Sequence, residues 1–392
     1  MKIITAITIF CLLFIGGVAT AQPQPQTPPD EKSIIGQLLN SLSIEEVNNF
    51  IVKINRELDE DIPQLNLASI QQIADKGLEL DWATVKQVIL SRFFREMAVN
   101  IHLMGKLIFL AVLSALLQNL LNSFERSTIS LLAYSICYIF MLVIALTAFF
   151  NALTLARTTV EAMVGFMEAL LPLLISLLAG VGAVTSAALF TPMMMFVVTS
   201  VSIIVKDVVL PLLFLAAVLQ CVNYFSDHYR LSNLSNLLRQ VGMVVQGFTM
   251  VIFVGIITIQ GVAGGVADGI GLRTAKYAAS TFIPVVGKMF ADTVELVMGA
   301  SLLVKNAIGI FGIVMVFTIC VFPLIKLISL ILIMKVAGAL VQPLGDERTA
   351  NSLDVMGNNL MLIFVAVLTV ALMLFLAITI IIGVGSMTMM LR

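Results

Sequence analysis

Apolar residues fill most of the chain from residue 101 onward, in long runs that short polar segments separate. A helix needs about 20 mainly apolar residues to cross a bilayer, and several of these runs are longer than that. Together they predict between about six and nine membrane crossings. The predicted apolar segments are residues 103–121, 130–154, 162–190, 192–222, 240–263, 280–303, 307–340 and 358–385.

Prolines stand inside four of these long runs, at Pro172, Pro211, Pro284 and Pro323. A proline removes a backbone hydrogen bond inside a helix. Interrupted backbone is tolerated at membrane depth only where protein buries it or where it faces a watery cavity. The pattern therefore predicts an all-α, polytopic membrane helical bundle whose helices break at these prolines, either as kinked helices or as re-entrant half-helices.

The prolines also indicate an internal repeat. Pro172 and Pro284 are 112 residues apart, as are Pro211 and Pro323 (284 − 172 and 323 − 211), and "FVGIITIQG" later returns as "FLAITIIIG". If each unit crosses the membrane an odd number of times, the second is inverted relative to the first, as in many transporters. Chance similarity between apolar segments is the alternative. The two predicted units are residues 160–264 and 272–386.

The start of the chain has the features of a secretory signal peptide. Lys2 precedes an apolar run, and Ala19 and Ala21 form a small-residue cleavage site. Residues 1–21 are therefore predicted to be a signal peptide, with an uncleaved signal anchor as the alternative. Export of this leader would place the following residues on the outer face of the membrane.

Residues 22–32 are rich in proline and glutamine and predict an extended tether. Residues 33–100 predict a small helical extracytoplasmic segment, with Ser43 and Glu46 as a capping box and a second amphipathic helix over 81–94. This segment is either a docking domain or a spacer that rests on the membrane. Residues 101–158 then predict an N-terminal transmembrane hairpin.

Composition agrees with a membrane protein, since 60% of the 392 residues are hydrophobic and 11% are charged. The net charge of −1 gives no electrostatic attraction for nucleic acid. The chain carries no phosphate-loop, HExxH or GxSxG motif, and its two histidines and four cysteines are not clustered. We therefore expect no enzyme activity, no cofactor and no metal.

One stretch, "FIPVVGKMFADTVELVMGASLLVKNAIG", concentrates charge at residues 282–309. Lys288, Asp292 and Glu295 are four and three residues apart, which places them within about 60° on one face of a helix, and Lys305 follows. Charges at membrane depth are costly and normally face water or a bundle interior. The stripe predicts either an interfacial or re-entrant helix whose charged face is hydrated, or a helix that lines a pore.

Other charged residues predict local features. Lys206 and Asp207 indicate a polar turn between two half-spans, with a proton relay as the alternative. Lys326 has no carboxylate nearby in sequence, so it either snorkels to an interface or faces a cavity. The glycine-rich residues 261–271 predict a flexible connector between the repeat units, and residues 339–354 predict a loop leading into the last span.

Three longer segments resemble a known family. They are "GLRTAKYAASTFIPVVGKMFADTVELVMGASLLVKNAIGIFG" (271–312), "ALVQPLGDERTANSLD" (339–354) and the C-terminal "FLAITIIIGVGSMTMMLR". With the leader and the polar helical segment, they resemble the stage III sporulation protein AE family of endospore-forming Firmicutes over essentially the whole chain.

The resemblance implies membership of a channel or secretion-like complex that links mother cell and forespore and supports late forespore gene expression and spore development. It implies location in the outer forespore membrane, with residues 22 to about 97 between the two membranes. The implied partners are ring-forming subunits, a secretion-type ATPase and a forespore-side protein, and homo-oligomerisation is open. A secondary solute transporter built from two repeated units remains the alternative, and intramembrane catalysis is a more distant one.

Overall fold

The computed structural model describes residues 82–123, 128–225, 231–282, 286–344 and 346–390, and within these ranges it is entirely helical. The signal peptide with Ala19 and Ala21, the tether of residues 22–32, most of the segment 33–100, and Pro284 lie outside the described residues. The helices are α5 (Trp82–Val99), α6 (Ile101–Ser123), α7 (Thr128–Gly180), α8 (Val184–Ile203), η1 (Ile204–Val209), α9 (Leu210–Phe225), α10 (Ser232–Phe282), α11 (Val286–Val341), η2 (Gln342–Leu344) and α12 (Glu347–Met390).

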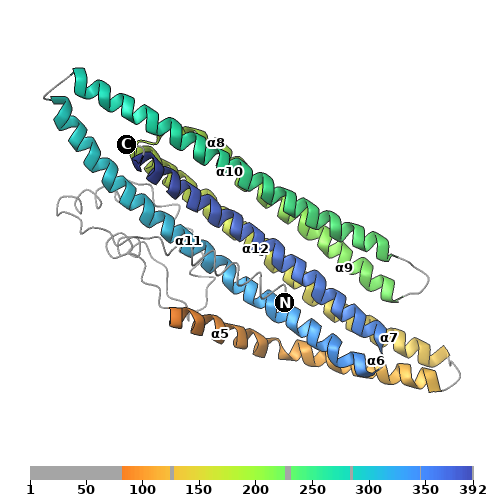
Figure 1. Cartoon of the computed structure of the whole chain (residues 1–392). Helices are drawn as coiled ribbons and strands as arrows, with labels where there is room; N and C mark the ends of the chain where they lie inside the picture. Colours follow the sequence, from red (N-terminus) through yellow and green to blue (C-terminus); the bar gives the residue numbers. More distant parts are fainter. Residues whose placement is uncertain (1–81, 124–127, 226–230, 283–285, 345, 391–392) are drawn as a thin grey trace.

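The long helices lie side by side along one axis, so the molecule is an elongated bundle (Figure 1). α12 runs through its middle, and 67% of its most apolar window is buried, against 28% for α10. The core is built from apolar side chains such as Phe166, Phe190 and Phe311, all of them fully or almost fully buried. At one end of the bundle, the end of α10 and the start of α11 project beyond α8 and α12 (Figure 1).

The helices are longer than the sequence pattern predicts. The segment 130–154 and most of 162–190 merge into α7, which has 53 residues, and most of 280–303 merges with 307–340 into α11, which has 56. The separating charges do not end either helix, because they find partners within the bundle, as described below. Among the described residues, five helices are long and apolar enough to cross a membrane, or six with the α5–α6 pair.

Pro172 and Pro323 do not divide their helices into half-helices, one of the two forms predicted for them. Pro172 lies inside α7 and Pro323 lies inside α11, and both helices continue on either side. Pro211 is the second residue of α9, and the chain there stays helical from α8 through η1. A proline costs one backbone hydrogen bond, a loss that packed neighbouring helices tolerate. Re-entrant half-helices therefore do not form at Pro172, Pro211 or Pro323.

The helix predicted over 81–94 is confirmed as α5, which begins at Trp82. α5 and α6 meet at Asn100 with a bend of 44°. α6 and the first part of α7 form the hairpin expected over 101–158, although α7 then runs on to Gly180. α5 packs against α11, so the end of the polar segment is attached to the bundle.

The flexible connector predicted over 261–271 is wrong as well, because these residues lie within α10. Their glycines serve close packing: a Cβ at Gly264 would collide with Ser186 at the start of α8. Small residues allow helix backbones to approach in this way. The proposed repeat boundaries at 160, 264 and 272 all fall inside α7 or α10, so the two units do not begin and end with helices.

Candidate functional site

Four charged side chains form a partly exposed polar layer between α7 and η1. Arg157 and Glu161 come from α7, and Lys206 and Asp207 come from η1. Arg157 Nη2 is 3.0 Å from Asp207 Oδ1, and Lys206 Nζ is 3.1 Å from Glu161 Oε1. Within α7, Arg157 Nε is 3.8 Å from Glu161 Oε1. Two cations and two carboxylates thus neutralise one another between two helices.

The polar turn predicted at Lys206 and Asp207 is wrong, because both residues belong to the π-helix η1 inside an unbroken helical run. π-Helical turns are rare and often occur at functional sites. Here the local change of winding coincides with the two side chains that pair with α7. Arg157, which separates two predicted apolar segments, lies inside α7 and takes part in the same layer.

On one side of this layer, α8 with η1, α10, α11 and α12 each have a stretch without charge of about 20 residues or more, the length that crosses a bilayer. The stretches are residues 184–205 of α8 and η1, 240–267 of α10, 306–325 of α11 and 355–390 of α12. Residues 162–180 of α7 contain Glu168, and Thr199 donates a hydrogen bond of 2.7 Å to its carboxylate.

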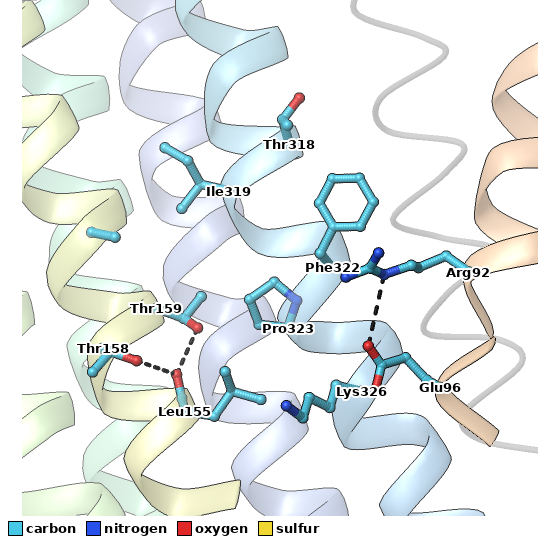
Figure 2. Close-up of a pocket in the computed structure, with 11 residues that line it drawn as sticks. Arg92, Glu96, Leu155, Thr158, Thr159, Thr318, Ile319, Phe322, Pro323 and Lys326 are labelled. Atoms are coloured by element: carbon cyan, nitrogen blue, oxygen red, sulfur yellow. Dashed lines mark hydrogen bonds and ion pairs between the residues drawn. The ribbon is translucent and has the colours of Figure 1, made fainter. Parts of the chain in front are cut away.

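A cavity of about 300 Å³ lies at the same level, between α5, α7 and α11. Its polar lining consists of Arg92, Glu96, Thr158, Thr159, Thr318 and Lys326. In Figure 2, Arg92 and Glu96 lie on one side, Thr158 and Thr159 on the opposite side, and Lys326 between them. The α7 residues of this lining are in the same two turns as Arg157 and Glu161.

Arg92 is fixed in this cavity by two contacts. Its guanidinium lies 5.7 Å from the centre of the Phe322 ring, and its Nε is 3.7 Å from Glu96 Oε1. Cation–π and ionic contacts of this kind hold the guanidinium plane in position. Lys326 is exposed and lines the cavity, which confirms one of the two predictions made for it.

Pro323 contributes through the backbone. Because proline has no N–H, the carbonyl of Ile319, four residues earlier and also in the lining, loses its usual helical partner. Thr158 and Thr159 donate to the Leu155 carbonyl at 3.0 and 2.6 Å. The cavity therefore combines two cationic side chains with several oxygen acceptors.

The four residues of the predicted charged stripe do not lie together. Lys288, Asp292 and Glu295 belong to the first turns of α11, at the end that projects from the bundle (Figure 1). Their side chains lie outside the described part of the structure. Since these turns continue directly into α11, they do not form a separate interfacial or re-entrant helix.

Lys305 is enclosed in the bundle and has no exposed surface. Its ammonium donates a hydrogen bond of 2.8 Å to the Ile382 carbonyl of α12. Gly385 leaves room for it, because a Cβ there would collide with Lys305 Nζ. Lys305 thus joins α11 to α12 and is separate from the projecting charges.

Two further polar contacts fix the opposite end of the bundle. Lys335 of α11 donates to Asp354 and Asn358 of α12 at 2.6 and 2.7 Å. Asp346, in the predicted loop before the last helix, is buried and accepts from Ser114 and from the Thr349 N–H at 2.7 and 3.1 Å. The loop predicted over residues 339–354 is confirmed only in part: η2 and Asp346 separate the helices, whereas residues 339–341 end α11 and residues 347–354 begin α12.

Sequence reasoning missed several of these residues. Arg92 was assigned only to an amphipathic helix over 81–94 that stopped before Glu96, although the spacing of the two residues matches a helical ion pair. Asp268 was placed in a connector, whereas it binds the start of α8. The partner of Asp268 comes from a distant part of the chain, which local spacing does not reveal. Within the described residues, no three or more His, Cys, Asp or Glu side chains gather to hold a metal ion.

Comparison with known proteins identifies the family. A sequence model of stage III sporulation protein AE matches residues 66–385. The chain is 35% identical over 399 aligned positions to the stage III sporulation protein AE of Bacillus subtilis (strain 168), and the alignment covers 100% of both proteins. No solved structure matches. The match spans all the described membrane helices, the polar layer and the α5–α7–α11 cavity, and the chain therefore belongs to the stage III sporulation protein AE family.

Proposed function

We propose that this sporulation protein is a polytopic membrane subunit of a channel or secretion-like complex that links mother cell and forespore. Full-length similarity to a stage III sporulation protein is the observation that carries the proposal. Its partners would be ring-forming subunits, a secretion-type ATPase and a forespore-side protein. The chain would act as a scaffold or gate and carry no enzyme activity of its own.

The bilayer is proposed to surround the half of the bundle between the polar layer and the projecting end. A helix of 56 residues is about 84 Å long, whereas the hydrocarbon core is about 30 Å thick, so one bilayer covers only part of α11. The uncharged stretches of four helices, α8 with η1, α10, α11 and α12, support this half. In the other half, Arg239, Lys335 and Asp354 interrupt α10, α11 and α12, although residues 128–156 of α7 and 210–225 of α9 carry no charge there.

This placement leaves Lys288, Asp292 and Glu295 in water at the projecting end, where they would face protein partners. It agrees with the cost of charges in hydrocarbon. It also places the polar layer at the opposite boundary, where partly exposed ion pairs are hydrated. The outer forespore membrane is the proposed location.

Deletion of the gene in its host tests the function. We expect small forespores that collapse after engulfment, with normal vegetative growth, and rescue by the wild-type gene. Normal spores together with a growth defect on defined solutes would contradict the proposal and favour a solute transporter. A Lys288→Gln, Asp292→Asn, Glu295→Gln triple variant that accumulates normally is expected not to restore the forespores, whereas full rescue would remove any role for these charges.

A further inference from the structure

We propose that the α5–α7–α11 cavity binds the phosphate and adjoining hydroxyl groups of an anionic phospholipid headgroup. The proposal uses the bilayer position given above and is independent of the channel assignment.

The charges of the lining select an anion. Among the described residues of the lining, Arg92 and Lys326 bring two positive charges and Glu96 brings one negative charge. Within the described residues, Lys326 has neither a hydrogen bond nor an ion pair that would neutralise it. A guanidinium and an ammonium from different helices can donate to different oxygens of one phosphate.

Glu96 does not cancel this preference. The 3.7 Å from Arg92 Nε to Glu96 Oε1 is longer than a hydrogen bond, so the carboxylate attracts the guanidinium without bonding closely to it. Phe322 supports the guanidinium from another side. Arg92 is thus held at the cavity, as the positioned donor of an anion site should be.

The oxygen acceptors of the lining favour a ligand that carries hydroxyl groups next to its phosphate. Thr318 donates to the Val314 carbonyl at 2.8 Å, and Thr158 and Thr159 donate to Leu155, so all three hydroxyls offer lone pairs to a ligand. The Ile319 carbonyl, unpaired by Pro323, is another acceptor. Hydroxyl groups next to a phosphate, as in a glycerol headgroup, would donate to them.

Size and position favour a lipid as the source of this phosphate. About 300 Å³ is the volume of about ten liquid waters, which exceeds the needs of a single small ion. The cavity lies at one end of the uncharged stretch of α11, residues 306–325. A headgroup bound there would have its acyl chains beside that stretch, within the proposed bilayer.

The test uses the full-length protein, purified in detergent and depleted of lipid, with binding followed by native mass spectrometry and thermal shift. The probes are short-chain phosphatidylglycerol, phosphatidylcholine of the same chain length, glycerol 3-phosphate and inorganic phosphate. We expect phosphatidylglycerol to bind at least ten-fold more tightly than the other three. Equal binding of both lipids would overturn the proposal, and tighter binding of either soluble phosphate would overturn the lipid as its source.

Variants assign the binding to the cavity. Lys326→Gln should weaken phosphatidylglycerol binding at least five-fold, and Lys326→Arg should retain it. The double variant Arg92→Gln, Lys326→Gln should bind phosphatidylglycerol more weakly still. Lys326 is exposed, so its replacement should not prevent folding. Lys106→Gln removes another exposed lysine, on α6 and outside the lining, and should bind as the wild type does. Unchanged binding by Lys326→Gln and the double variant would refute the site.

Discussion

At the scale of single residues, the fit between Lys305 and Gly385 is the tightest feature of the α11–α12 contact. A buried ammonium must be hydrogen-bonded, and here the Ile382 carbonyl supplies the acceptor. The absence of a side chain at Gly385 gives the ammonium its space. Removal of that space should cost stability, because the displaced charge would leave its acceptor.

Gly385→Ala is therefore expected to lower the free energy of unfolding by about 1–3 kcal/mol, the usual cost of overpacking. The measurement is thermal unfolding of the purified protein in detergent. Gly383→Ala is the matched control, because a Cβ there meets nothing within 4 Å, and it should unfold like the wild type. Equal unfolding temperatures for the two variants would show that Lys305 moves aside without cost.

Residue spacing predicts faces of helices, and it does not predict what covers them. For Lys326, a position facing a cavity was one of the two predicted placements, and Lys326 lines the cavity. It also grouped Lys305 with Lys288, although α12 buries the former and the latter lies at the projecting end. The difference depends on a helix that follows in sequence, which no local pattern contains.

At the scale of elements, Asp268 of α10 binds the backbone at the beginning of α8. The N-cap residue of α8 is Ala183, which has no side-chain oxygen to satisfy the first backbone N–H groups. Asp268 accepts from the N–H groups of Thr185 and Ser186 at 2.7 and 2.9 Å. Just before Ala183, Gly182 lies in the turn that follows α7 and has a φ of +89°, which allows the tight turn between the two helices.

Asp268→Asn should lower the free energy of unfolding by about 1–2 kcal/mol, because the amide keeps one acceptor oxygen and replaces the other with an NH2 group that cannot accept from an N–H. It should also raise amide hydrogen exchange in the first turn of α8. Glu347→Gln is the control, since Glu347 is an exposed carboxylate in the first turn of α12. If amide exchange at Thr185 and Ser186 stays at the wild-type rate, the hydrogen bonds to Asp268 do not stabilise the start of α8.

Helical class and the approximate helix positions follow from apolar periodicity, as α5 illustrates. Helix ends do not follow from this periodicity. The prolines at 172 and 323 and the glycines of residues 261–271 predict interruptions, whereas all of them lie inside helices. Within a packed bundle, these residues allow close approach or a missing hydrogen bond without ending the helix. Their effect is decided by neighbouring helices rather than by the residue itself.

At the scale of the whole molecule, the polar layer divides the bundle into two halves that both carry exposed apolar side chains. Phe196 lies in the half assigned to the bilayer and Phe140 in the other, and they are 72% and 62% exposed. Tyr277, on α10 at the projecting end, is 74% exposed. These three positions distinguish the halves by their access to water.

In a variant whose native cysteines are replaced, cysteine at position 277 or 140 should react with a water-soluble maleimide, and cysteine at position 196 should not. Lipid excludes both the reagent and the thiolate that reacts with it. The protein is labelled in nanodiscs and again after denaturation, so that each site serves as its own control. Protection at 140 with reaction at 196 would place the bilayer around the opposite half.

The continuity of α11 has a mechanical consequence. One helix carries the projecting end, the buried Lys305, and the Phe322, Pro323 and Lys326 of the cavity. A helix is stiff along its axis. A partner that pulled on the projecting turns of α11 would therefore transmit the force to Lys305 and to the headgroup site at the same time. Pro323 removes one backbone hydrogen bond, so α11 bends most easily at this residue. Force applied on one side of the membrane would thus reach the lipid on the other side through a single element.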